Sequence, residues 1–261
     1  MKITKKLCLV AIIISIAVFV ALFLFPFTPT DNPIYNSLIS NMISRLAGSV
    51  VFILTINYLG INIFKGKIIN AVFIIPCAAV ALNNFPFIPV ISGNESVLDA
   101  DSFLIIVLII ECVLVAVFEE TAFRGTLTVV MCKNCKSRGK LILKIFIASA
   151  IFGLLHFVNL LEGADIGSVL VQIGYSTLIG AMCSALLFVC GNIIPCIIVH
   201  TVYNFCGQLG GEIAWDNATV IITVFVSVIA AAALVYGVIK HGFDNFQKIY
   251  SKTSHDFKKN D

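Results

Sequence analysis

Long apolar segments, separated by short polar stretches, dominate the chain from near its first residue to about position 240. A membrane-spanning helix needs about 20 consecutive, mostly apolar residues, and segments of this kind recur along the whole sequence. They lie near 8–25, 41–61, 68–84, 102–127, 141–161, 168–190, 193–209 and 218–239. The pattern predicts an all-α protein, a polytopic membrane helical bundle of about eight transmembrane helices, with residues 1–261 forming a single integral membrane domain.

The composition agrees with this prediction. The chain is 59% hydrophobic and only 12% charged, whereas a soluble domain is about half apolar and about a quarter charged. A soluble globular domain is therefore excluded. We expect the lipid bilayer as a partner, and no nucleic acid.

The positions of the charges predict which ends of the spans are cytoplasmic. Cytoplasmic loops are enriched in Lys and Arg, and here these residues collect before the first span, between spans two and three, between spans four and five, and after span eight. The other charged loops carry Asp and Glu alone. This alternation predicts that both termini are cytoplasmic. The small size and short loops favour a bacterial cell membrane.

The segment FEETAFRG places three charges, Glu119, Glu120 and Arg124, at the end of an apolar run. A charge near the centre of a spanning helix costs roughly 2.5–3.5 kcal/mol, so these side chains should face the protein interior or a wet cavity. Glu120 and Arg124 are four residues apart and can pair on one helix face. Glu119 is rotated by about 100° from Glu120. We therefore expect Glu120 and Arg124 to support the site, and Glu119 to point at the chemistry.

Two histidines lie within predicted spans at a depth similar to that of Glu119. Phe152 precedes His156 by four residues, and His200 precedes Asn204 by four, so each pair shares a helix face. Three helices could thus bring a carboxylate, two imidazoles and an amide together. Two further charges in the spans, Glu111 and Arg45, are interpreted as structural or cavity-lining and receive no role.

This set of side chains favours hydrolysis of an amide bond. A carboxylate beside a histidine can activate water as a general base, and histidine and asparagine donors can stabilise the oxyanion of a tetrahedral intermediate. Two histidines and a glutamate could alternatively hold a catalytic zinc ion. No Ser or Cys with an adjacent base stands out, which makes a covalent nucleophile less favoured.

The three motifs together resemble a known family. E-E-x-x-x-R at Glu119, Glu120 and Arg124, F-x-x-x-H at Phe152 and His156, and H-x-x-x-N at His200 and Asn204 occur in the order typical of the CPBP family. That family comprises CAAX prenyl proteases and bacteriocin-processing or bacteriocin-immunity proteins, also called Abi proteins. The resemblance covers about 102–210, which we interpret as the protease core.

The resemblance implies an intramembrane endopeptidase that cleaves a membrane-associated protein or peptide, with roles such as bacteriocin processing or self-immunity. In it, Glu119 and His156 would activate the water, while His200 and Asn204 would bind the oxyanion. The supporting residues would be Glu120, Arg124 and Phe152. The resemblance favours a glutamate-type enzyme without a cofactor over a zinc metalloprotease.

Two other classes of function stay open. A non-catalytic immunity or regulatory protein could keep this fold and bind a partner in the membrane. A small transporter could also carry charges at membrane depth, but transporters often consist of two repeated halves. Here the charged groups concentrate in one half of the chain, and no matching repeat is visible.

Overall fold

The computed structural model describes residues 31, 33–64, 67–93, 102–210 and 217–249. Within these ranges the chain forms helices joined by short turns and contains no strand, which confirms the all-α prediction. The expected first span, 8–25, lies outside the described residues. The elements are α2 (Pro33–Tyr58), η1 (Ala71–Phe73), α3 (Ile74–Leu82), α4 (Phe87–Ile91), α5 (Ser102–Glu119), η3 (Glu120–Thr128), α6 (Val129–Cys132), α7 (Arg138–Leu154), η4 (Leu155–Glu162), α8 (Ile166–Cys190), α9 (Ile194–Gly210), α10 (Asn217–Gly237) and η5 (Val238–Gly242).

Five helical segments are long and apolar enough to cross a membrane. Each overlaps one of the spans expected from the sequence, although Tyr35–Tyr58 begins earlier than the expected 41–61 and Ala218–Ile249 extends beyond the expected 218–239, so the protein is an integral membrane helical bundle. The segments are Tyr35–Tyr58, Ser102–Cys132, Arg138–Leu161, Ile166–Cys190 and Ala218–Ile249.

Two of the expected spans are shorter helices. Ala71–Leu82 and Ile194–Leu209 each contain 10–17 residues, which at about 1.5 Å per residue is less than the roughly 30 Å thickness of the hydrocarbon core. The first of them is bounded by Asn70, whose φ of 51° is left-handed, and by the turn before Pro86. A residue that precedes proline is disfavoured in the α conformation. The count of about eight spans is therefore approximate.

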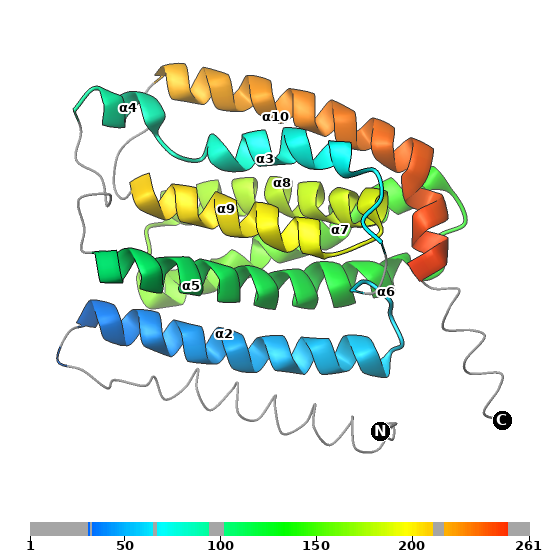
Figure 1. Cartoon of the computed structure of the whole chain (residues 1–261), viewed down its shortest axis with the longest axis horizontal. Coiled ribbons are helices and arrows are strands. Elements are labelled where there is room, and N and C mark those ends of the chain that lie inside the picture. Colours follow the sequence, from blue (N-terminus) through cyan, green and yellow to red (C-terminus); the bar gives the residue numbers. More distant parts are fainter. Residues whose placement is uncertain (1–30, 32, 65–66, 94–101, 211–216, 250–261) are drawn as a thin grey trace.

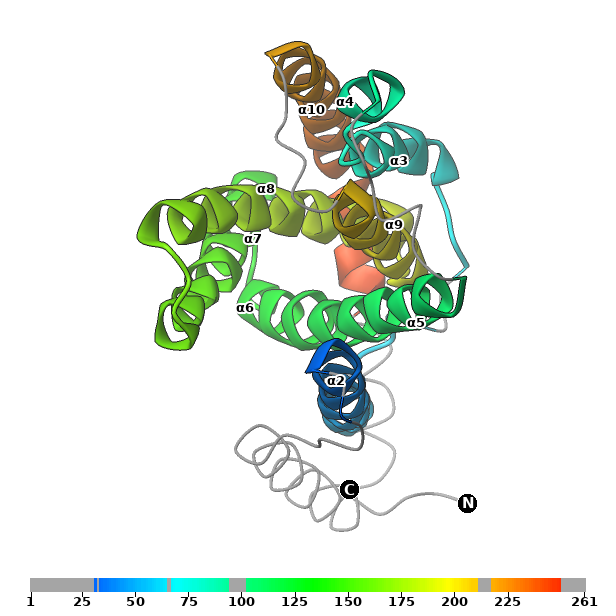
Figure 2. The same ribbon diagram turned by 90° about the vertical axis from the view of Figure 1, so that its left-hand side faces the viewer.

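The helices lie side by side with α9 near the middle of the bundle (Figure 1). α9 packs against α5, α3 and α8, while α2 packs along α5 and α7 packs along α8. Figure 2, which looks along the bundle, shows α5, α7, α8 and α9 arranged around a common interior. This arrangement places the three motif-bearing segments next to one another.

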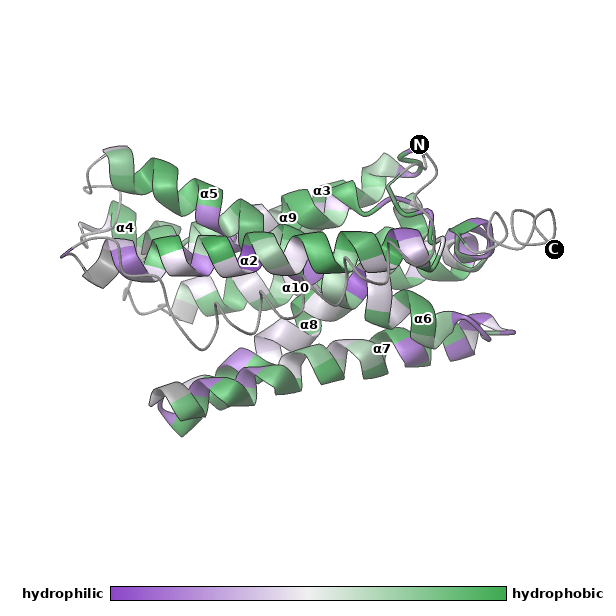
Figure 3. Ribbon diagram, turned by 90° about the horizontal axis from the view of Figure 1, so that it is seen from below, coloured by the Kyte–Doolittle hydropathy of each residue, from purple (hydrophilic) through white to green (hydrophobic). Residues whose placement is uncertain are grey.

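The bundle has two chemically different ends. One end carries the last residues of α2, α6 and the start of α7 (Figure 1); it is called the basic end, after Lys67, Lys133, Lys136 and Arg138. The opposite end carries the first residues of α2 and α5; it is called the acidic end, after Asp31 and Asp165. Between the ends, most of the helix residues are hydrophobic (Figure 3).

Small residues allow the helices to approach closely where the motifs lie. A Cβ atom on Gly153 of α7 would clash with the side chain of Thr177 and lie 2.7 Å from the carbonyl oxygen of Ile173, both on α8. Small residues at helix contacts are a common device of membrane bundles, because they let two backbones pack together. Gly153 therefore fixes the distance between α7 and α8 just before His156.

Candidate active site

The two adjacent glutamates lie where the helix changes its geometry. Glu119 is the last residue of α5, and Glu120 begins the π-helical segment η3. Short π-helical segments within α-helices occur frequently at functional sites. Because adjacent helical residues are rotated by about 100°, the two carboxylates have different surroundings: Glu120 is fully buried, while the side chain of Glu119 is 14% exposed.

Glu120 belongs to a buried polar network that joins two helices. Its Oε1 atom lies 3.3 Å from Nη1 of Arg124, which is within ion-pair distance but lacks hydrogen-bond geometry. The same Oε1 atom lies 2.7 Å from Nδ1 of His200 on α9. Because Glu120 pairs with a guanidinium, its carboxylate is the acceptor and Nδ1–H of His200 is the donor. The network fixes the orientation of the His200 ring.

Glu119 faces the other nitrogen of the same imidazole. Its Oε2 atom lies 3.7 Å from Nε2 of His200, which is longer than a hydrogen bond. The two neighbouring carboxylates thus flank one histidine, and the Glu119 carboxylate is the one that remains accessible.

Phe152 connects the buried network to the second histidine. The guanidinium carbon of Arg124 lies 4.3 Å from the centroid of the Phe152 ring, a cation–π distance. The His156 ring meets Phe152 edge-on, with centroids 5.5 Å apart. His156 lies in η4, the 3-10 continuation of α7, and is half-buried.

A cavity of about 280 Å³ brings the candidate catalytic residues together. Glu119, His156, His200 and Asn204 all line it, and so does Phe152. Glu120 and Arg124 do not line it, in keeping with their burial. A liquid water occupies about 30 Å³, so the cavity has room for a substrate carbonyl and water beside Glu119.

Other polar residues of the cavity wall had received no role from the sequence. Arg45 of α2 and Glu111 of α5 both line it, and the Arg45 guanidinium carbon lies 5.1 Å from the Phe118 ring centroid. Gln208 donates a hydrogen bond of 3.3 Å to Glu111. The remaining lining residues are Val115, Asn159, Gln172, Tyr175, Ser176, Ile179 and Tyr203.

Helical spacing could have identified several of these residues. Glu111 and Glu119 are eight residues apart on α5, as are His200 and Gln208 on α9. Residues eight apart differ by about 80° and lie within one broad stripe of a helix, about 100° wide. A polar stripe at this spacing within an apolar segment is the signal of an inward-facing polar wall.

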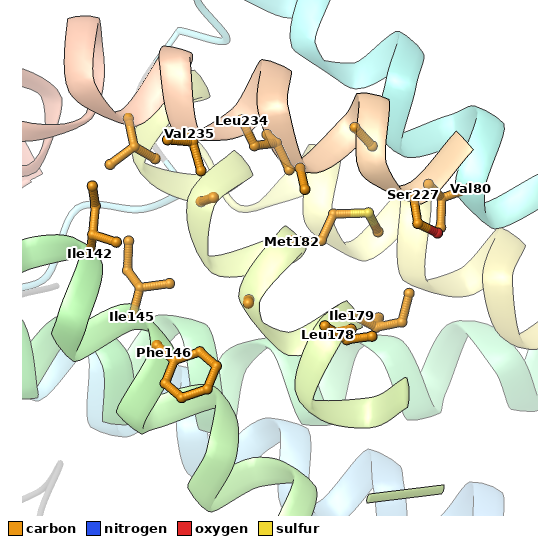
Figure 4. A pocket seen from close by; sticks show the side chains of 15 residues that line it. Val80, Ile142, Ile145, Phe146, Leu178, Ile179, Met182, Ser227, Leu234 and Val235 are labelled. Atoms are coloured by element: carbon orange, nitrogen blue, oxygen red, sulfur yellow. The ribbon is translucent and has the colours of Figure 1, made fainter. Parts of the chain in front are cut away.

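Two further cavities adjoin the first. One, of about 620 Å³, shares Tyr175, Tyr203, Asn204 and Gln208 with it. The other, of about 290 Å³, is almost entirely apolar and lies between α7, α8 and α10 (Figure 4). Ile179 of α8 lines all three cavities, so its side chain forms part of the wall of each.

The candidate residues do not form a preformed metal site. Within the described part of the chain, no group of three His, Cys, Asp or Glu side chains is placed to hold a metal ion. The Nδ1 atom of His200 is already engaged by Glu120. The tetrahedral ligand set that zinc requires is therefore not assembled, and independence from metal stays a prediction.

Comparison with known proteins identifies the region that contains these residues. Residues 101–206 match the family model described as Rce1-like, "Type II CAAX prenyl endopeptidase Rce1-like". No curated protein and no solved structure matches the chain. The matched region contains all three motifs and ends within α9, after Asn204. Residues 101–206 are thus similar to the Rce1-like family, in agreement with the CPBP resemblance of the motifs.

Proposed function

We propose that this protein is an intramembrane endopeptidase that hydrolyses a peptide bond of a membrane-associated protein or peptide. One observation carries the proposal: Glu119, His156, His200 and Asn204, from three separate helical segments, line one polar cavity inside an apolar bundle. Intramembrane ionisable groups gathered in this way indicate a functional site. The similarity to the Rce1-like family supports peptide hydrolysis as the reaction.

The reaction would begin with water held between Glu119 and His156. Glu119 accepts a proton from this water as its oxygen attacks the carbonyl carbon of the peptide bond, and His156 orients the water. The attack produces a tetrahedral oxyanion. Protonated Glu119 then returns the proton to the amide nitrogen as the carbon–nitrogen bond breaks, which releases a carboxylic acid and an amine.

His200 and Asn204 would stabilise the oxyanion. Because Glu120 holds Nδ1 of His200, it is Nε2 that faces the cavity, and in its protonated form it can donate to the developing negative charge. Asn204, four residues later on the same helix, would supply a second donor. Each well-placed donor of this kind contributes roughly 3–4 kcal/mol to transition-state stabilisation.

The adjoining cavities support a membrane-anchored substrate. The catalytic cavity and the apolar cavity of α7, α8 and α10 share Ile179 as a lining residue. An apolar flank or a lipid anchor of the substrate would occupy this second space while the peptide bond lies beside Glu119. We place the protein in a bacterial cell membrane with both termini cytoplasmic, and bacteriocin processing or self-immunity are the roles that we propose.

The test is cleavage of a library of membrane-anchored and prenylated peptides in proteoliposomes. We expect the wild-type protein to cleave members of the library, and the Glu119→Gln and His156→Ala variants to lose this activity while keeping their fold. The Glu111→Gln variant is the matched control, because Glu111 lines the same cavity from the same helix. Undiminished cleavage by both catalytic variants would overturn the proposal.

A further inference from the structure

In the described part of the chain, the two polar cavities lie in one half of the bundle. On α5 the catalytic cavity extends from Glu119 to Glu111, which is nearer to the start of that helix at the acidic end. On α9 it extends from His200 to Gln208, nearer to the end of that helix. Eight helical residues correspond to about 12 Å. The wall of the catalytic cavity therefore extends from the catalytic groups towards the acidic end.

The larger adjoining cavity lies in the same half. Its wall includes Asn84 and Pro86, which follow α3, and Gly207 near the end of α9. It also includes Thr223, close to the start of α10. Figure 1 shows that these helix ends lie at the acidic end of the bundle.

The other half of the bundle holds the apolar cavity of α7, α8 and α10 and is otherwise tightly packed. Every residue from Met182 to Cys190, at the basic end of α8, is buried. A Cβ atom on Gly125 would lie 2.7 Å from Cδ1 of Ile63 and 2.8 Å from Cδ1 of Ile56. The N–H of Ile193 donates to the carbonyl of Ile63 at 3.1 Å. Among the described residues, apolar side chains therefore separate the basic end from the catalytic groups.

The walls of the two polar cavities carry the hydrogen-bonding groups that an extended peptide needs. Amide side chains both donate and accept hydrogen bonds, and an unwound peptide within a membrane exposes N–H and C=O groups that lipid cannot satisfy. Five such side chains line the two polar cavities: Asn84, Asn159, Gln172, Asn204 and Gln208.

We propose that the substrate of this site is an extended polypeptide segment that enters from the acidic end of the bundle. Because loops rich in Lys and Arg are cytoplasmic, the acidic end faces the non-cytoplasmic side. The substrates are then proteins or peptides whose scissile segment lies outside the cytoplasm. This inference rests on the proposed peptidase function for the reaction, and on the shape of the cavities for the direction.

The direction of substrate entry can be tested without measuring cleavage. Ser176 is buried and lines the catalytic cavity in the middle of α8, so the nearly isosteric Ser176→Cys variant reports on water entering that cavity. The probe is 2-sulfonatoethyl methanethiosulfonate, a charged thiol reagent that does not cross a bilayer. Lys136→Cys, at an exposed position of the basic end, is the control, and the wild-type chain gives the background from its own cysteines.

We expect Ser176→Cys to react at least ~10-fold faster when the reagent is on the non-cytoplasmic side of intact cells than in inverted vesicles, because the charged reagent is excluded from the bilayer. Lys136→Cys should show the opposite preference. Reaction of Ser176→Cys from the cytoplasmic side, or from neither side, would overturn the inference. Reaction of Lys136→Cys from the non-cytoplasmic side would overturn the assignment of the membrane sides.

A second experiment distinguishes the direction of substrate entry from the proposed peptidase activity. Anchored peptide libraries are presented in oriented proteoliposomes, with the unanchored segment on one face or the other. We expect cleavage only of segments on the face from which Ser176→Cys is labelled, and cleavage on the opposite face alone would contradict the inference. If labelling shows the expected direction but the wild-type protein cleaves neither library, the proposed function fails while the direction of access stands.

Discussion

The Nδ1 atom of His200 lies 2.7 Å from Oε1 of Glu120, and this contact joins the middle of α9 to the π-helical segment that follows α5. The opposite side of the imidazole faces Glu119. One glutamate of the pair therefore holds the histidine, while its neighbour remains at the cavity wall. Substitutions of these two adjacent glutamates should therefore have different effects.

Replacement of Glu120 should lower the thermal stability of the protein. The Glu120→Gln variant leaves the Arg124 guanidinium buried without its counter-charge, and breaking a buried ion pair in this way costs about 3–5 kcal/mol. Thermal unfolding in detergent would measure the loss. The double variant Glu120→Gln with Arg124→Met removes both charges and should recover part of the lost stability. A single variant as stable as the wild type would show that the buried network contributes little.

Close packing of α7 against α8 should be necessary for activity. The Gly153→Ala variant adds a methyl group that clashes with Thr177, and overpacking typically costs about 1–3 kcal/mol. We expect a lower unfolding temperature and a reduced kcat, because α7 leads into His156. Gly174→Ala is the matched control, since a Cβ atom at Gly174 meets nothing within 4 Å. Equal effects of the two substitutions would contradict this explanation.

The wall that the cavities share should determine how anchored substrates bind. Ile179 lines all three cavities, so an Ile179→Trp variant would place a bulkier side chain between the catalytic and apolar cavities. We expect KM for anchored peptides to rise by about tenfold, a loss of about 1.4 kcal/mol of binding. Short peptides without an anchor should be cleaved as before. An equal loss for both kinds of peptide would mean that the apolar cavity does not receive the anchor.

Activity should be independent of metal. The described residues contain no preformed group of three ligands, and the proposed mechanism needs none. We expect the purified protein to contain far less than one zinc ion per chain, and its cleavage rate to be unchanged after treatment with a chelator. Activity that disappears with zinc and returns when zinc is added would contradict the glutamate-type mechanism.

Much of the fold could be predicted because lipid imposes a simple rule on sequence. The segments that became Ser102–Cys132, Ile166–Cys190 and Ala218–Ile249 are recognisable as long apolar runs. The expected span 193–209 matches α9 to within one residue. The expected span 68–84 was too long, since hydropathy measures apolar length but does not detect a left-handed residue such as Asn70. Helix ends formed by local turns depend on conformations that the apolar pattern does not encode.

The site was predictable in its chemistry but not in its extent. Charges at membrane depth drew attention to Glu119, Glu120 and Arg124, because their burial is costly. The same argument applied to Arg45, which is the single charge of α2, and to Glu111, which shares α5 with Glu119. The cavity that both line, however, forms only when α2, α5 and α9 pack together. The π-helical geometry from Glu120 onward also lies beyond an argument based on 3.6 residues per turn.

The most direct test of the proposed mechanism compares kcat/KM for one cleaved peptide among the wild type, Glu119→Gln and Glu111→Gln. Both variants remove one carboxylate from the same helix and the same cavity. We predict a loss of at least ~10²-fold for Glu119→Gln, as expected for a missing general base, and a much smaller loss for Glu111→Gln. Equal losses, or full activity of Glu119→Gln, would contradict the assignment of Glu119 as the catalytic base.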